Sequence, residues 1–124
     1  MKVLTIKEPW ASLIINGYKV YEFRTWKTNY RGKFLVHAAK GIDKKNLNRF
    51  KDYNIKINPG HILGEAEITD CIYSDEKFHK KLLKLDKEIY KNSVNEYAFK
   101  LDNIKKYNKQ IEVKGKLGFW EFNK

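Results

Sequence analysis

The chain has 124 residues, which is enough for one domain with a hydrophobic core and too few for two domains of ordinary size. Apolar residues make up 42% of it and aromatic residues 15%, so intrinsic disorder is excluded although 33% of the positions are charged. The net charge of +11, from 26 basic and 15 acidic residues, favours a polyanionic partner, nucleic acid above all. Because only three basic residues are arginines, a lysine-rich composition that serves solubility is the alternative.

The cysteine count and the hydropathy of the chain predict a cytoplasmic location. Cys71 is the only cysteine, so no disulfide can form within the chain, as is typical of intracellular proteins. No run of about 18 apolar residues occurs, and the first ten residues, MKVLTIKEPW, lack the apolar stretch of a signal peptide. We therefore expect a cytoplasmic protein that does not associate with membranes.

The first part of the chain predicts a strand, a helix and a second strand. Val3–Ile6 is expected to be the first strand, and Pro9 suits the first turn of the helix. An apolar helix face at i, i+3 and i+4 is formed by Trp10, Leu13 and Ile14. Asn16-Gly17 ends the helix, and residues 19–25 alternate as a half-buried strand does.

The rest of the chain predicts five further strands and two helices. The strands are expected at residues 33–39, 62–72, 97–101, 111–113 and 117–122. One helix is capped by Asp43 and runs to about Phe50; the other is capped by Ser74 or Asp75 and ends near Asp86. This pattern predicts an α+β fold with a single domain over residues 1–124. Its mixed sheet is expected to close, or nearly close, into a barrel, because closure protects strand edges.

One eight-residue segment, from Gly17 to Arg24, places three charged side chains in the second predicted strand. Side chains two apart on a strand share a face, so Glu22 and Arg24 point the same way and can form an ion pair. Lys19 has the opposite parity, but it stands two residues after Gly17, where the chain is still turning, so its direction is open. An exposed strand with an ordinary surface ion pair, worth about 0–1 kcal/mol, is the alternative.

This segment carries a resemblance to a known family. Residues 4–40 resemble the ASCH domain family. The family signature, G-x-K-x-x-E-x-R, is represented here by Gly17, Lys19, Glu22 and Arg24. Later pieces similar to the remaining strands of the family lie at residues 64–71, 97–99 and 115–120. The resemblance implies a PUA-like barrel with helices packed at its rim, and a cleft of signature residues that binds RNA, a nucleotide or a nucleoside.

The resemblance also raises the question of catalysis. Some members are amidohydrolases that remove the acyl group of N4-acetylcytidine, and a ribonuclease has been described. In the amidohydrolases a threonine nucleophile occupies the position of Glu22 and acts beside the signature lysine and a downstream glutamate. Because Glu22 replaces that nucleophile, we expect binding rather than amide hydrolysis; in an enzyme, Lys19 and Glu22 would transfer protons. The candidates for a second carboxylate are Glu65, Asp70, Asp86 and Glu88.

Five more residues are expected to contact a ligand if the signature residues converge. In that case the ammonium and guanidinium groups can hold a phosphate, while the carboxylate accepts from an exocyclic amine. Trp10 and Trp26 can stack on a base, and Tyr30 and Arg31 can add stacking or phosphate contacts. Ser12 can donate a hydrogen bond. The alternatives are a core position for Trp10 and a solvated helix surface for Ser12.

No metal or cofactor site is predicted. The histidines His37, His61 and His79 are scattered and form neither an i, i+4 pair nor a Cys/His cluster. No P-loop, dinucleotide-binding fingerprint or G-x-S-x-G motif occurs. We expect His37 to be a structural histidine with satisfied hydrogen bonds. A third possible function is an interaction module whose charged pair only supports the fold.

Overall fold

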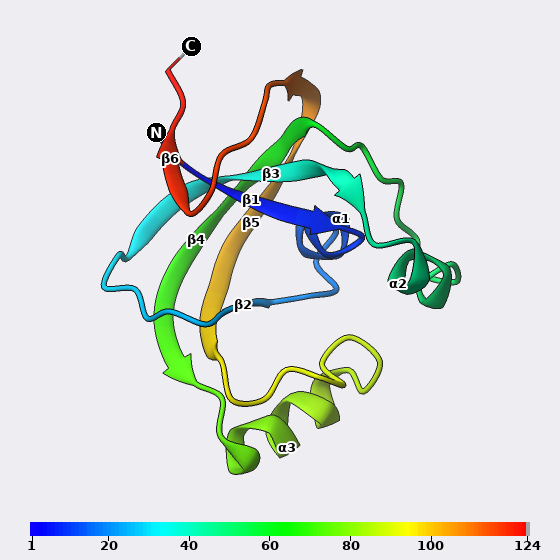
Figure 1. The fold of residues 1–124 in the computed structure, drawn as a ribbon, viewed down its shortest axis with the longest axis vertical. Helices are drawn as coiled ribbons and strands as arrows, with labels where there is room; N and C mark the ends of the chain where they lie inside the picture. Colours follow the sequence, from blue (N-terminus) through cyan, green and yellow to red (C-terminus); the bar gives the residue numbers. More distant parts are fainter. Residues whose placement is uncertain (124) are drawn as a thin grey trace.

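The computed structural model describes residues 1–123, which contain six strands and three helices (Figure 1). In chain order they are β1 (Lys2–Glu8), α1 (Trp10–Ile15), β2 (Tyr21–Arg24), β3 (Gly32–Ile42), α2 (Lys44–Arg49), β4 (His61–Tyr73), α3 (Glu76–Leu85), β5 (Tyr97–Glu112) and β6 (Phe119–Glu121). The side chain of Asp43 accepts a backbone N–H at the start of α2, and Asp75 does the same for α3. The α+β class and both helix caps are therefore confirmed.

The strands form one mixed sheet in the order β2-β5-β4-β3-β1-β6. β1 and β3 are parallel, and every other neighbouring pair is antiparallel. Figure 1 shows β4 and β5 running side by side and bending together, so that the sheet wraps around α1. The edge strands β2 and β6 do not pair with each other, so the predicted closed barrel is not confirmed. The guanidinium of Arg24 on β2 donates to the carbonyl oxygen of Thr5 on β1, so a side-chain hydrogen bond links these two strands, which do not pair with each other.

β5 differs from the sequence prediction. The two strands expected at residues 97–101 and 111–113 are parts of one strand of 16 residues. The polar run between them pairs with β4 through two of the three register shifts of this strand pair, and Asn103 has a positive φ of 51°, as irregular strand positions often do. The hydroxyl of Tyr107 donates to Glu65 on β4 over 2.8 Å. Pairing with a long neighbouring strand therefore outweighs the poor strand propensity of lysine and asparagine.

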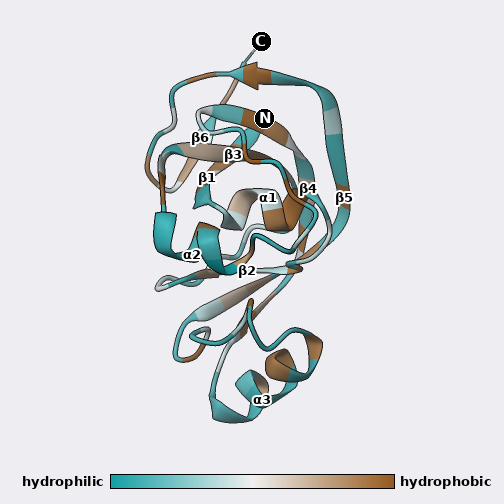
Figure 2. Ribbon diagram, turned by 90° about the vertical axis from the view of Figure 1, so that its right-hand side faces the viewer, coloured by the Kyte–Doolittle hydropathy of each residue, from teal (hydrophilic) through white to brown (hydrophobic). Residues whose placement is uncertain are grey.

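α1 is a core helix. Five of its six residues are buried, and it packs inside the curved sheet, where Figure 2 shows hydrophobic residues on α1 and β3 and mostly hydrophilic ones on α2. The helix begins after Glu8, a fully buried carboxylate that accepts from the backbone N–H and the hydroxyl of Ser12 over 2.8 and 2.6 Å. Ser12 is fully buried, so the solvated helix surface considered as the alternative for it is wrong; its hydroxyl fixes the start of α1.

A second hydrophobic cluster places the loop after α3 next to β2. Its buried members are Leu13, Phe50, Leu82, Ile89 and Tyr90. The hydroxyl of Tyr90 also accepts the backbone N–H of Val20 over 2.9 Å, and burial raises the pKa of that hydroxyl to about 12. The loop of residues 86–96 is therefore held against the start of β2, and the two segments become opposite sides of one cavity.

The helices of residues 1–123 are short. The longest, α3, has 10 residues, whereas a bilayer span needs about 20. None of them is long and apolar enough to cross a membrane.

Candidate functional site

The turn after α1 decides where Lys19 points. Gly17 adopts φ of +84°, a left-handed conformation that glycine takes without strain. The backbone N–H groups of Tyr18 and Lys19 both donate to the carbonyl of Leu13, over 2.9 and 3.1 Å. The chain therefore folds back on α1, and the Lys19 side chain lies beside β2 instead of following the alternation of the strand.

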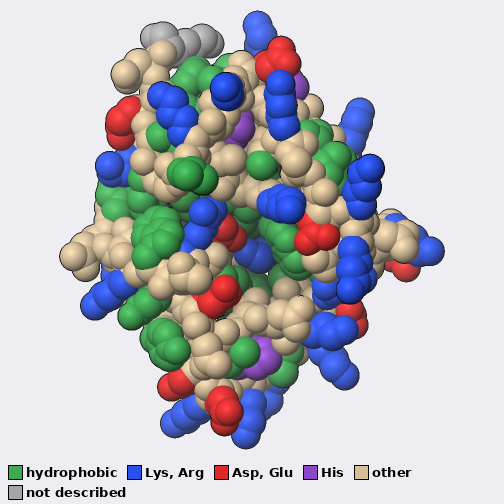
Figure 3. Space-filling model, viewed as in Figure 1, with side chains coloured by type: hydrophobic (Ala, Val, Ile, Leu, Met, Phe, Trp, Pro, Cys, Tyr) green, Lys and Arg blue, Asp and Glu red, His purple; other side chains and the backbone are tan. Residues whose placement is uncertain are grey.

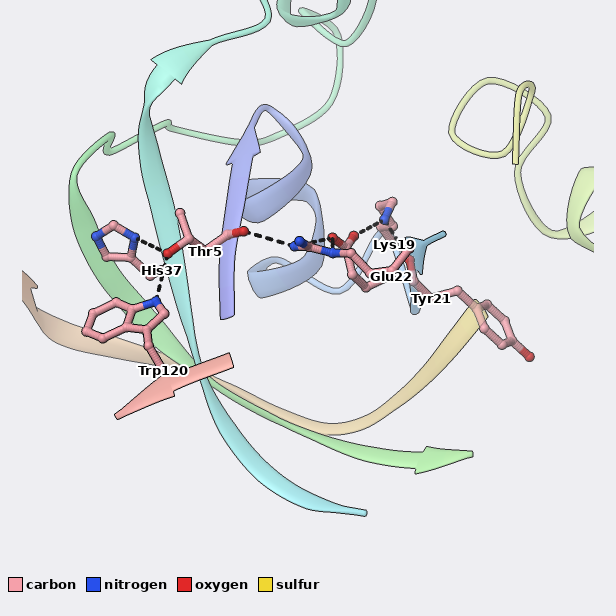
Figure 4. A network of polar contacts seen from close by, with 7 residues as sticks. Thr5, Lys19, Tyr21, Glu22, His37 and Trp120 are labelled. Atoms are coloured by element: carbon pink, nitrogen blue, oxygen red, sulfur yellow. Dashed lines mark hydrogen bonds and ion pairs between the residues drawn. The ribbon is translucent and has the colours of Figure 1, made fainter. Parts of the chain in front are cut away.

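Lys19, Glu22 and Arg24 form one ionic cluster, called here the signature triad (Figure 4). The ammonium of Lys19 lies 2.9 Å from Glu22 Oε1, and Arg24 Nη2 lies 2.9 Å from Glu22 Oε2. Arg24 Nε donates to the same Oε2 over 3.1 Å. Lys19 and Glu22 are only 4% and 6% exposed, so the ordinary surface ion pair considered from the sequence is wrong.

The charge state of Glu22 results from two opposing effects. Burial alone would raise the pKa of its carboxyl group, because a charged group loses solvation. The ammonium of Lys19 and the guanidinium of Arg24, with the hydrogen bonds that each donates, outweigh burial and hold the pKa of Glu22 below its ordinary value. Glu22 is therefore a carboxylate at neutral pH, and the triad carries a net charge of +1.

The triad is also tied to the backbone and to a second polar group. Lys19 Nζ donates to the carbonyl of Tyr21 over 2.7 Å, and Arg24 Nη2 donates to the carbonyl of Thr5 over 2.9 Å. The hydroxyl of Thr5 contacts His37 Nδ1 over 3.1 Å and accepts from the indole N–H of Trp120 over 3.0 Å. Figure 4 shows this continuous line of contacts across β1 and β3 to β6.

A cavity of about 590 Å³ opens next to the triad. All three triad residues line it, together with Trp10 and Phe23. Figure 3 shows a hollow near the centre of the molecule with basic and acidic side chains around it. The charged lining residues are Lys7, Lys19, Glu22, Arg24, Arg49, Lys91 and Glu96. Five cations against two carboxylates give 5 − 2 = +3, a potential that favours an anionic ligand.

Four of the eight predicted ligand-contacting residues line the cavity, namely Trp10, Lys19, Glu22 and Arg24. The other four do not. Ser12 is buried at the start of α1. The ring of Trp26, 37% exposed, packs edge-on against Phe99 and Phe119. The hydroxyl of Tyr30 donates to the backbone carbonyl of Lys33, and Arg31 donates to the carbonyls of residues 28 and 30.

A comparison with known families identifies the domain. A family model described as "ASCH domain" matches residues 4–115, which is most of the chain. The chain belongs to the ASCH domain family. The resemblance found in the sequence is thereby confirmed, and the signature of the family forms the charged wall of the cavity in this ASCH domain.

The relatives of this ASCH domain include much longer proteins. Activating signal cointegrator 1 of Homo sapiens is 26% identical over 132 residues, which covers 97% of this chain and 22% of that protein. The protein of the same name from Mus musculus is 26% identical over 133 residues, with the same coverage. The chain thus spans about a fifth of the length of these relatives.

Solved structures share the fold of this ASCH domain. The crystal structure of ASCH from Zymomonas mobilis superimposes with a TM-score of 0.57 at 15% identity, covering 90% of this chain and 72% of that chain. A mutant of the same protein gives a TM-score of 0.56 at 14% identity. At this level of identity the likeness concerns the fold.

The sequence did not indicate several lining residues of the cavity. They are Lys7, Asn46, Arg49, Lys91 and Glu96, and they come from β1, α2 and the loop before β5. The carboxylates considered from the sequence, Glu65, Asp70, Asp86 and Glu88, are not among the lining residues; Glu96 is. Nothing in the sequence brings residue 96 near residue 22. That proximity follows from the pairing of β2 with β5, in which Arg24 faces Tyr97.

No group of three metal-ligating side chains occurs within residues 1–123. His37 is 1% exposed, and both of its ring nitrogens have partners, Thr5 and the carbonyl of Val113. A carbonyl oxygen can only accept, so Nε2 carries the proton and Nδ1 accepts from the Thr5 hydroxyl. The expectation of a structural histidine is therefore confirmed.

Proposed function

We propose that this ASCH domain binds RNA or a free nucleotide by taking one base into the cavity beside the signature triad. The observation that carries the proposal is the burial of a charged lysine and glutamate in the wall of an open cavity of about 590 Å³. Buried charges are costly unless they are paired or used. Here they are paired with each other and still face a space large enough for a nucleoside.

The triad offers both kinds of hydrogen-bonding group that a base edge requires. Oε1 of Glu22 has Lys19 as its one partner and keeps a lone pair, so it can accept from an exocyclic amine. The third N–H of Lys19 and the Nη1 group of Arg24 have no acceptor among residues 1–123 and can donate to a ring nitrogen or carbonyl. The indole of Trp10 lines the same cavity and offers a surface for stacking, worth about 1–3 kcal/mol per base.

Hydrolysis of a modified nucleoside or of RNA has less support. A general base works best with a pKa near the operating pH, and the pKa of Glu22 is held below its ordinary value. Lys19 donates to Glu22 and to the carbonyl of Tyr21, so its ammonium is fixed as an ion-pair partner. Glu96 is the other carboxylate of the cavity, and any proton transfer would depend on it.

Shift mapping by NMR tests the proposal. Nucleosides, nucleoside monophosphates and short single-stranded RNAs are titrated into labelled protein, and we expect the largest shifts at the triad and at Trp10. Glu22→Gln keeps the shape of the side chain and removes its charge, and it should weaken binding on the order of tenfold, as loss of a charge-assisted hydrogen bond does. Glu121→Gln, at an exposed residue of β6, is the control with the same charge change.

Three outcomes are informative. Shifts confined to the cavity, without change of the ligand during incubation, support binding. Absence of cavity shifts with every nucleoside, nucleotide and RNA would defeat the proposal. Conversion of N4-acetylcytidine or cleavage of RNA, abolished in Lys19→Ala while the far-UV spectrum stays unchanged, would establish the hydrolase instead.

A further inference from the structure

The donors of the signature triad are largely committed within the protein. Two of the three N–H groups of Lys19 are donated to Tyr21 and Glu22. The Nε and Nη2 groups of Arg24 are donated to Glu22 and Thr5. With Glu22 neutralising one of the two cations, the triad has little capacity left for a dianionic phosphate. It suits a base edge better.

The other cations of the cavity differ in how far they are engaged. Arg49 donates to Asn46 and to the carbonyl of Glu88, and its Nη2 lies 3.6 Å from the Glu88 carboxylate. Lys7 and Lys91 are exposed, and neither has an ion-pair partner within 4.0 Å among residues 1–123. They are called here the mouth lysines.

The mouth lysines line the same cavity but come from separate elements. Lys7 lies near the end of β1, and Lys91 lies in the loop after α3. The sheet and the second hydrophobic cluster hold both backbones in place, so no part of the fold has to move to bring the two ammonium groups to one cavity. An ammonium group is a mobile point charge that suits phosphate, which accepts from several directions.

We propose that the mouth lysines bind the phosphate of the ligand, so that the cavity prefers a phosphorylated nucleotide to the corresponding nucleoside. This rests on the proposed function: the base lies against the triad, and the phosphate lies at the exposed end of the cavity. Glu96 is the second carboxylate of the lining, and with both carboxylates counted the charged residues of the whole lining still carry a net charge of +3. The shared chemistry is a phosphate ester, whether on a free nucleotide or within RNA.

The experiment compares affinities for matched pairs of ligands by calorimetry or NMR titration. Each nucleoside is paired with its 5′-monophosphate and its 3′-monophosphate, and a short single-stranded RNA represents the phosphodiester. The variant is the double substitution Lys7→Gln/Lys91→Gln. The control is Lys87→Gln/Lys109→Gln, which removes the same charge from two exposed lysines outside the cavity lining. Thermal unfolding confirms that both variants fold.

In the wild type, we expect a monophosphate to bind on the order of tenfold more tightly than its nucleoside, in line with two charge-assisted contacts at partly exposed positions. The double variant should lose that advantage and keep its affinity for the nucleoside, and the control should retain both. Equal affinity for nucleoside and monophosphate, or an advantage that survives in the double variant, overturns the inference and leaves the proposed function standing. Absence of binding by every ligand removes the proposed function and this inference with it.

Discussion

One line of polar contacts in Figure 4 has two ends of opposite character. The ionic end is the signature triad. The neutral end consists of Thr5, His37 and Trp120. Thr5 joins the two ends. Its backbone carbonyl accepts from Arg24, and its hydroxyl is hydrogen-bonded to the rings of His37 and Trp120. Both ends are largely buried, yet only the ionic end consists of charged groups.

The difference follows from what each end faces. The triad and Thr5 line the cavity, whereas His37 and Trp120 do not, and His37 packs against the segment of residues 113–115. His37 Nε2 donates to the carbonyl of Val113, and a Cβ atom added at Gly115 would lie 2.8 Å from the His37 ring. Burial, the largest effect, lowers the pKa of His37 and keeps the ring neutral. The buried charges thus lie at the cavity, where they are paired with one another, whereas the rings of His37 and Trp120 lie away from it and make neutral hydrogen bonds.

The largest predicted loss of stability comes from removing the carboxylate of the signature triad. Glu22→Ala leaves the ammonium of Lys19, itself 4% exposed, without its counter-charge. Removing one partner of a buried ion pair costs about 3–5 kcal/mol, so the free energy of unfolding should fall by that amount in urea titrations. Glu121→Ala removes a carboxylate from ion pairs whose side chains are 40–59% exposed and should cost at most about 1 kcal/mol. Equal losses in the two variants would show that the triad is an ordinary surface pair.

A smaller loss of stability is expected from a substitution at Thr5 that disrupts the neutral end and leaves the ionic end intact. Thr5→Val keeps the backbone carbonyl that Arg24 contacts and removes only the hydroxyl that meets His37 and Trp120. Two partly buried groups then lack partners, which should lower the free energy of unfolding by about 1–2 kcal/mol. Nucleotide affinity should stay within about twofold of the wild type. A large loss of affinity in this variant would mean that the neutral end positions the ligand site.

The order of the elements was predictable from the sequence, but whether the sheet closes was not. Pro9 before the apolar face of α1 and Gly17 after it indicate that helix, and Asp43 at the N-cap indicates α2. The sequence predicted two strands in place of β5, because residues 102–110 are mostly polar. The hydrogen bond from Tyr107 to Glu65 that orders this run joins two different strands, so the local sequence does not reveal it. Likewise, no local pattern shows that a side chain of β2 is hydrogen-bonded to β1.

The site, like the fold, was predictable only in part: the signature triad was predicted, and most of the lining residues from other elements were not. Alternation along β2 predicted the pair of Glu22 and Arg24, and the family signature added Lys19. Lys7, Lys91 and the other missed lining residues come from elements that only the fold brings together. Trp26 lies in a polar connection that suggested a ligand contact, but its ring packs on Phe99 and Phe119, because nearby aromatic residues offered it a partly buried position.

A third predicted effect concerns pH and isolates the neutral end. The pKa of His37 is lower in the folded state than its ordinary value of 6.5. Below pH 6.5, His37 therefore binds a proton more readily in the unfolded chain than in the folded one. The free energy of unfolding should therefore decrease as the pH falls from 6.5, by at most about 1.4 kcal/mol per pH unit for one group. The pKa of Glu22 is lowered as well, so its contribution is lost in the same direction, but only below its ordinary value of 4.5. Urea titrations between these two pH values should thus show a slope that His37→Gln flattens and Glu22→Gln does not. If Glu22→Gln flattened this slope instead, the ionic end would control stability across both ranges.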